Sequence, residues 1–242
     1  MRLSEFTTLL KLSAIRKQSV ENYFKFQRYQ ASLIHKDLQK YGLQFAKRVL
    51  DIGSGIGGYV YEFSEKHEKT NFYSLDLNPL PFAQEKYKDK KIFTVRGDIA
   101  HPPFKDNSFD FIFASSVIEH IEEQARLTKS IANIATENSL IYISFPPFYS
   151  LMGGHSISPL HYLPGNLPFY IYKNFYRQTQ SSFKNYGLVK TTLRSAENII
   201  KNNFDIIDIK PRFFTSIKPL INIPILREII APHIEFFLRP KK

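Results

Sequence analysis

The sequence predicts an α/β fold in which helices cover both faces of a doubly wound, mostly parallel sheet. Two observations predict it. Short apolar runs of strand length alternate with segments of helix length, and glycine or Asn-Pro punctuation follows several of the strands. The chain has 242 residues, of which 43% are hydrophobic and 23% charged. This balance is typical of a globular domain with additional segments and excludes a disordered or collagen-like chain.

The elements follow one another in a regular order. Residues 3–44 are expected to be mainly helical, because apolar side chains recur there at helical spacing until Gly42. The apolar runs behind them predict strands at Arg48–Ile52, Asn71–Asp76, Lys91–Val95, Phe109–Phe113, Ser139–Ser144, Phe204–Ile209 and Ile234–Arg239. The segments between them predict helices at Tyr59–Lys66, Pro81–Lys90, Ile121–Ala135 and Arg194–Lys201, and a short one at Ile225–Ile230.

Residues 145–189 interrupt this repeat and are expected to be irregular. They begin at Pro146-Pro147, contain many Phe and Tyr residues, and fall in a stretch from Asn138 to Ala196 without Asp or Glu. A loop of this length is usually a lid or a binding insertion, although its aromatic side chains could also form a small core. We therefore divide the chain into an N-terminal helical cap (1–46), a core (47–144), a substrate-lid insertion (145–189) and a C-terminal completion of the sheet (190–242).

Composition excludes several kinds of site. The chain has no cysteine, so a disulfide scaffold, a thiolate zinc site, a Cys nucleophile and an iron–sulfur cluster are ruled out. No apolar run approaches the roughly 18–20 residues of a membrane span, and no signal-peptide pattern is present. A cytoplasmic protein is expected.

The net charge of +11 is unevenly distributed. Residues 1–48 carry ten basic and three acidic side chains, whereas residues 49–144 carry ten basic and fourteen acidic ones. Residues 145–242 are again basic. A basic excess of this size favours an anionic partner, with a solvated basic surface as the alternative.

A glycine-rich loop follows the first predicted strand. The segment D-I-G-S-G-I-G-G spans residues 51–58, between a strand and a helix. Its glycines permit a tight turn and the close approach of a ligand, and the following helix offers free N–H groups. As G-x-G-x-x-G, the loop could hold a dinucleotide with Asp76 on the ribose, which makes a nicotinamide-dependent reductase one interpretation.

Four motifs in order resemble the class I methyltransferases that use S-adenosylmethionine (SAM). They are the acid Asp51 two residues before the first glycine, Leu75-Asp76 at the end of the second strand, Gly97-Asp98-Ile99 after the third, and F-D-F-I-F-A-S-S-V-I-E-H-I over residues 109–121. The last is similar to the type 11 small-molecule group of that family. The resemblance covers residues 47–145 and implies a Rossmann-like sheet of about seven strands whose last strand is antiparallel. It disfavours the reductase.

The resemblance also implies roles for single residues. Asp51 and the glycine loop would hold the methionine end of SAM, Asp76 would accept both ribose hydroxyls, and Asp98 would accept the adenine amino group. For each acid alone, a solvated loop carboxylate or a helix cap is the alternative. The expected cofactor-binding set is Asp51, Gly53, Ser54, Gly55, Gly57, Asp76, Leu77, Asp98, Ile99 and Ser115.

Two histidines are candidates for the base of a methyl transfer to oxygen. The acid-free stretch leaves His155 and His161 as proton acceptors, and His155 follows the flexible Gly153-Gly154. The alternative is that both bond the loop backbone. Glu119 and His120 are weaker candidates. Without a carboxylate nearby in sequence, two histidines predict no metal site.

The expected function is SAM-dependent transfer of a methyl group to a small molecule, at a hydroxyl of a glycan-, lipid- or metabolite-like and anionic acceptor. The pair Pro146-Pro147 follows the fifth strand rather than the fourth and lacks a preceding Asn, which argues against methylation of nucleobase amino groups. RNA methylation through the basic flanks and a non-catalytic SAM-binding scaffold are the alternatives. A membrane surface is a further partner that the basic N-terminal helices could contact.

Overall fold

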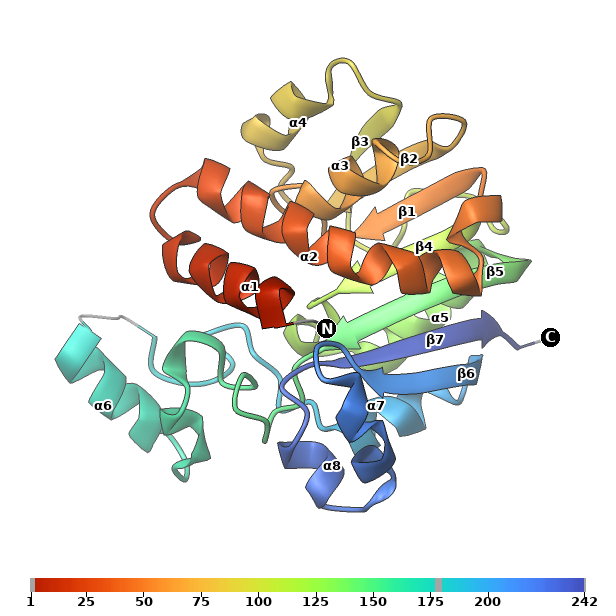
Figure 1. The fold of residues 1–242 in the computed structure, drawn as a ribbon. Helices are drawn as coiled ribbons and strands as arrows, with labels where there is room; N and C mark the ends of the chain where they lie inside the picture. The colour runs from red at the N-terminus through yellow and green to blue at the C-terminus, as the bar shows by residue number, and fades with distance from the viewer. Residues whose placement is uncertain (1–2, 177–179, 242) are drawn as a thin grey trace.

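A single seven-stranded sheet organises the molecule (Figure 1), here in a computed structural model that describes residues 3–176 and 180–241. The strand order is β3-β2-β1-β4-β5-β7-β6. Residues 1–2 of the expected cap, residues 177–179 of the expected insertion and residue 242 lie outside the described part of the chain. The strands are β1 (Arg48–Ile52), β2 (Asn71–Asp76), β3 (Ile92–Arg96), β4 (Phe109–Ser115), β5 (Ala135–Phe145), β6 (Phe204–Pro211) and β7 (Ile234–Pro240).

The strand directions confirm the expected fold class. β1 to β5 are parallel, and β7 lies antiparallel between β5 and β6. The order reverses between β1 and β4, so the chain winds outward in two directions from this pair. In open sheets of this type, ligands bind beyond the carboxyl ends of the strands at such a reversal point.

Helices cover both faces of the sheet, as expected. Within the described residues none is long and apolar enough to cross a membrane. α2 and α3 pack on one face with α4, while α5 and α7 pack on the other (Figure 1). The helices are α1 (Leu3–Ile15), α2 (Val20–Tyr41), α3 (Gly58–Ser64), α4 (Pro81–Tyr87), α5 (Gln124–Ile134), α6 (Leu167–Tyr176), α7 (Leu193–Ile200) and α8 (Leu226–Ile229).

The central strands contribute side chains to a core on each face. Val49 and Phe111 pack with the helices α2 and α3, whereas the next residues, Leu50 and Ile112, pack with α5 and α7. Because a sheet covered on both faces buries both sets of side chains, these strands are continuous apolar runs in the sequence.

The long N-terminal helix has clear boundaries. The Ser19 side chain accepts a hydrogen bond from the Asn22 N–H at 3.1 Å and so caps the start of α2. Gly42, with φ of +132°, ends it. α2 packs against α3, the helix that follows the glycine loop, and the segment between α1 and α2 lies on the side of the molecule toward which the parallel strands point (Figure 1).

The expectation of an irregular segment over residues 145–189 was wrong in part, because α6 lies within it. Its sequence, L-P-F-Y-I-Y-K-N-F-Y, is mostly aromatic and aliphatic, so few polar residues mark the exposed side of a helix. The segment has a small core of its own, formed by Phe148, Ile157, Phe169, Phe183 and Leu188. The boundary between α5 and β5 was also misplaced, since α5 ends at Ile134 and β5 begins at Ala135.

Candidate active site

The glycine loop follows β1 at the carboxyl edge of the sheet. Gly53, Gly55 and Gly57 have φ values of +66°, +53° and +78°, a left-handed region that favours glycine. At Gly57 a Cβ atom would also lie 1.7 Å from the hydroxyl oxygen of Tyr87. The loop therefore needs glycine at this position for two separate reasons.

The carboxylate of Asp76 ties the end of β2 to the glycine loop. One oxygen accepts the Gly55 N–H and the other accepts the Asn78 N–H, each at 2.9 Å. After β3, the carboxylate of Asp98 accepts the Ala100 N–H at 2.8 Å. Backbone groups thus fix both acids at neighbouring strand ends.

A cavity of about 250 Å³ lies between these strand ends, and we call it the strand-end cavity. Apolar side chains form most of its wall, and Asp76 and Asp98 supply its two carboxylates. This combination suits a flat base together with a pair of sugar hydroxyls. The lining residues are Ile52, Gly53, Leu75, Asp76, Leu77, Gly97, Asp98, Ile99, Ser116, Val117, His120 and Ile121.

Asp51 lies next to this cavity without lining it. The residue is 3% exposed, and within the described part of the chain its Oδ2 atom has no hydrogen-bond partner. Burial, and then the nearby Asp76, raise the pKa of the Asp51 carboxyl well above its usual value. A buried carboxylate oxygen without a partner is costly, and a cationic ligand group would remove that cost. The ammonium of a methionine moiety fits this requirement.

Two other residues of the expected cofactor-binding set, Ser54 and Ser115, form hydrogen bonds within the protein. Ser54 is buried and its hydroxyl lies 2.6 Å from that of Ser74, so it bonds within the protein. Ser115 lies at the end of β4, where its hydroxyl accepts hydrogen bonds from Ser144 at 3.0 Å and from Arg212 at 3.1 Å. Neither side chain lines the strand-end cavity.

A second cavity of about 590 Å³ adjoins the first, and we call it the basic cavity. Ser116 lines both. Six stretches of chain that are distant in sequence form its wall, and none of the described residues lining it is an Asp or Glu. They are Arg16, Lys17, Phe26, Gln30, Tyr59, Ser116, Pro146, Leu151, Met152, His155, Ser156, Ser158, Arg212 and His233.

Arg212 is the buried cation of this cavity. Its guanidinium donates to the Tyr59 hydroxyl at 2.8 Å and to Ser115, and it lies 3.3 Å from Nε2 of His233. Burial and the positive charge of Arg212 lower the pKa of His233 well below its usual value, so this imidazole is a neutral acceptor. The nearest acid, Glu235, is 3.9 Å away.

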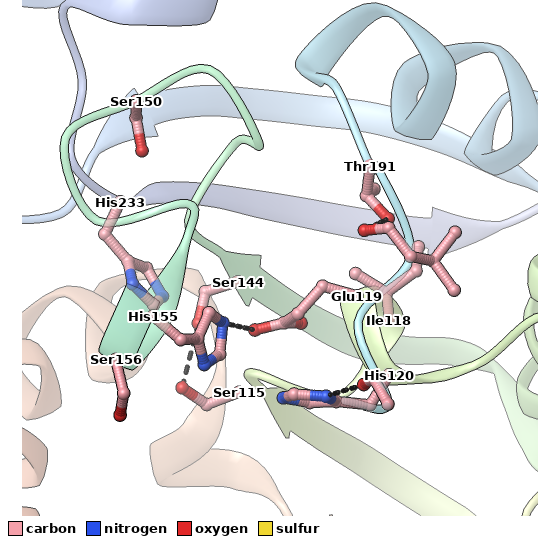
Figure 2. A network of polar contacts seen from close by, with 12 residues as sticks. Ser115, Ile118, Glu119, His120, Ser144, Ser150, His155, Ser156, Thr191 and His233 are labelled. Atoms are coloured by element: carbon pink, nitrogen blue, oxygen red, sulfur yellow. Dashed lines mark hydrogen bonds and ion pairs between the residues drawn. The ribbon is translucent and has the colours of Figure 1, made fainter. Parts of the chain in front are cut away.

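His155 points toward Glu119, which lies just beyond β4 (Figure 2). Its Nε2 atom lies 3.7 Å from the carboxylate. Burial raises the pKa of Glu119 to about 8, while burial and then His120 lower the pKa of His155 to about 4. The pKa of His155 leaves its imidazole neutral near pH 7.

The other expected base, His161, has a different environment. It is 2% exposed and does not line the basic cavity. Its Nε2 atom lies 3.2 Å from the Ser150 carbonyl oxygen and its Nδ1 atom 3.3 Å from the Ser158 hydroxyl. Its ring also packs closely on Gly154. These contacts bond His161 within the insertion.

Sequence reasoning missed most of the basic cavity. Tyr59, Arg212 and His233 come from a helix and from the C-terminal segment, and no local motif marks them. Glu119 was noted, but nothing in the sequence connects it with His155. Arg212 is flanked by apolar residues in Pro211-Arg-Phe-Phe214, which is the one signal that could have indicated a buried cation.

Comparison with known proteins agrees with these motifs. A family model described as a methyltransferase domain matches residues 50–143. The sterol 24-C-methyltransferase erg6 of Schizosaccharomyces pombe is 35% identical over 85 residues, which cover 33% of this chain and 22% of that protein. The chain thus spans only about a fifth of this relative. An uncharacterized methyltransferase of Mycobacteroides abscessus is 23% identical over 81% of this chain and 77% of its own.

A solved structure extends the likeness in fold to most of the chain. Phosphoethanolamine N-methyltransferase 2 of Haemonchus contortus, in complex with phosphomonomethylethanolamine and S-adenosylhomocysteine, superposes with a TM-score of 0.57. The match covers 84% of this chain and 51% of that one, at 21% sequence identity. At this identity the comparison supports the fold.

Proposed function

We infer, from the premise that this chain is a class I SAM-dependent methyltransferase, that it methylates a hydroxyl group of a small anionic molecule held in the basic cavity. One observation carries the inference. The strand-end cavity, which contains the expected cofactor acids, and the basic cavity meet at Ser116. A methyl donor in the first would therefore lie next to an acceptor in the second.

The strand-end cavity supplies the groups that SAM requires. In this proposal Asp76 accepts the two ribose hydroxyls and Asp98 accepts the adenine amino group. Asp51 pairs with the ammonium of the methionine end, which would give its unpartnered oxygen a partner. Ser116 lies where this cavity meets the basic cavity, so it would border both the methyl donor and the acceptor.

Methyl transfer needs alignment more than acid–base chemistry. The acceptor oxygen forms a bond to the methyl carbon while the bond between that carbon and sulfur breaks, and S-adenosylhomocysteine leaves. The hydroxyl proton must also leave, and His155 is the neutral imidazole at the cavity wall that can accept it. His161 takes no part in this step because its ring nitrogens face atoms of the insertion.

The charge of the basic cavity sets the class of acceptor. Arg16, Lys17 and Arg212 line it together, and no lining residue is acidic. Clustered cations in a partly buried cavity attract an anion and orient it. The Haemonchus contortus enzyme of similar fold binds a phosphate-bearing compound. We therefore propose an acceptor that bears a phosphate or carboxylate group as well as the hydroxyl.

A label-transfer experiment tests this function. The protein is incubated with methyl-tritiated SAM and, in separate reactions, with the small-molecule fraction of a bacterial extract and with total RNA. We expect the label to enter small molecules that an anion-exchange resin retains, and to remain there after mild base as an ether would. Label in RNA, or none in either fraction from protein that binds S-adenosylhomocysteine, would contradict the proposal.

A further inference from the structure

We propose that Glu119, His120 and His155 form a site for a Zn²⁺-like divalent cation in the wall between the two cavities. This inference rests on the proposed function, because it supplies a further group at the acceptor hydroxyl. His120 lines the strand-end cavity and His155 lines the basic cavity. The site therefore borders the place where methyl donor and acceptor would meet.

The geometry is close to that of a bound cation. One ligand atom from each of the three residues lies within 4.8 Å of the other two, and Nε2 of His155 is 3.7 Å from Oε1 of Glu119. Bonds of about 2.0–2.1 Å in a tetrahedral zinc site separate neighbouring ligand atoms by roughly 3.4 Å. Small side-chain movements would thus close the shell.

The unpartnered atoms of the cluster point to a missing ligand. Glu119 is 1% exposed, and neither carboxylate oxygen has a hydrogen-bond partner among the described residues. Nε2 of His155 has none either. Buried polar groups in native proteins are nearly always bonded, so three such atoms in one cluster require an explanation. A cation held by all three residues provides it.

Two of the three proposed ligands, Glu119 and His120, are held by backbone groups at the end of the insertion. Nδ1 of His120 lies 2.5 Å from the Gly187 carbonyl oxygen, to which it donates (Figure 2). Its Nε2 atom is therefore the free acceptor, which is the arrangement that metal-binding histidines usually have. The Glu119 carbonyl accepts the Val189 N–H at 2.8 Å. Both anchoring residues belong to the end of the insertion.

The backbone at His155 is held in a rare conformation. Its φ is +51°, which lies in the left-handed region that side chains other than glycine seldom adopt. Strain of this kind persists where the surrounding structure requires one side-chain direction. Here that direction aims the imidazole at Glu119.

Two histidines and one carboxylate are ligands that Zn²⁺ prefers, and three protein ligands leave a fourth position open. An acceptor oxygen could occupy that position from the basic cavity. Coordination would favour its deprotonated form, with the proton released to solvent. In the cation-bound protein His155 is then a ligand, and solvent takes its place as proton acceptor.

Zinc binding to the purified, chelator-treated protein tests the site by equilibrium dialysis at pH 7.5. We expect one Zn²⁺ per chain, with affinity reduced at least tenfold in Glu119→Gln and in His155→Gln. The matched control is His67→Gln, because His35 and His67 form another close pair of imidazoles, 2.9 Å apart. That control should retain the ion.

Two results would overturn the site. One is undiminished zinc binding by folded Glu119→Gln and His155→Gln proteins, which would place the bound ion elsewhere in the molecule. The other is loss of the ion only in His67→Gln. Titration of the same samples with S-adenosylhomocysteine separates this failure from failure of the proposed function, since neither Glu119 nor His155 lines the strand-end cavity. Circular dichroism checks that each variant is folded.

Discussion

The strand-end cavity and the basic cavity share a wall but are built in different ways. The first is formed by consecutive strand–loop units, and its charged groups are the carboxylates of Asp76 and Asp98. The second is formed by distant segments, and its charged groups are the cations Arg16, Lys17 and Arg212. One side of the site thus suits a ligand with hydroxyl and amino groups, and the other suits an anion.

Because of this difference, we expect substitutions in the two cavities to have different effects. Residues of the strand-end cavity are held by backbone hydrogen bonds, so changes there should affect cofactor binding. Side chains of the basic cavity are held by other side chains, as Arg212 is by Tyr59 and Ser115. Changes there should affect stability and anion binding while leaving the cofactor unaffected.

Arg212→Met should have the largest effect on stability. It leaves His233 without its donor and removes a cation near Glu235, and breaking a buried charged network costs about 3–5 kcal/mol. Urea denaturation measures the free energy of unfolding. The control is the exposed Arg194→Met, which should change it by less than about 0.5 kcal/mol. Equal values for the two variants would show that Arg212 is not held as described.

Gly57→Ala should destabilise the glycine loop beside the strand-end cavity. The new Cβ would collide with the Tyr87 hydroxyl at a φ of +78°. Gly165 is a matched control, because its φ is +59° but a Cβ there meets nothing within 4 Å. We expect Gly165→Ala to cost about 1 kcal/mol, and Gly57→Ala at least ~2 kcal/mol more. Thermal unfolding compares them, and similar melting temperatures would contradict the close packing of the glycine loop.

Asp51 should make cofactor binding depend on pH. Its raised pKa means that the free protein must lose a proton before the carboxylate can pair with an ammonium group. Affinity for S-adenosylhomocysteine should therefore rise between pH 5 and pH 8, as the carboxyl group loses its proton. Asp51→Asn should bind more weakly and with a flat pH profile. Parallel profiles for the two proteins would remove Asp51 from the proposed ammonium site.

The smallest expected effect is the increase in melting temperature when an anion binds the basic cavity. Inorganic phosphate should raise the melting temperature of the wild-type protein by a few degrees, because it binds the folded state. The double variant Arg16→Gln, Lys17→Gln should lose most of this increase. Lys11→Gln, Lys36→Gln removes two exposed charges away from the basic cavity and should keep it. The same loss in both double variants would indicate a general charge effect.

The strand-end cavity is built from consecutive residues and the basic cavity from distant ones, and this explains how much of the site could be predicted from the sequence. The sheet, the glycine loop and the acids at its edge were predictable because each depends on a few consecutive residues with a fixed conformation. Asp76 and Asp98 needed only the ends of two strands to be located. The antiparallel last strand depended on the family resemblance rather than on a pattern in residues 234–240.

The basic cavity could not be derived in that way. Arg212 lies near Tyr59 only because β6 and α3 are brought together by the complete fold. The pairing of Glu119 with His155 depends on the path of the insertion, and the mostly apolar sequence of α6 conceals even its helix. Tertiary packing, which no local pattern encodes, determines this half of the site.

The most direct test of two separate sides is a calorimetric titration with S-adenosylhomocysteine. The wild-type protein and the Arg16→Gln, Lys17→Gln variant should bind it with the same affinity. Asp76→Ala should bind at least about 100-fold more weakly, because a carboxylate that accepts two hydroxyl groups is lost. The exposed Asp205→Ala serves as its control. Undiminished binding by folded Asp76→Ala, or an equal loss in the variant lacking the two cations, would contradict the account.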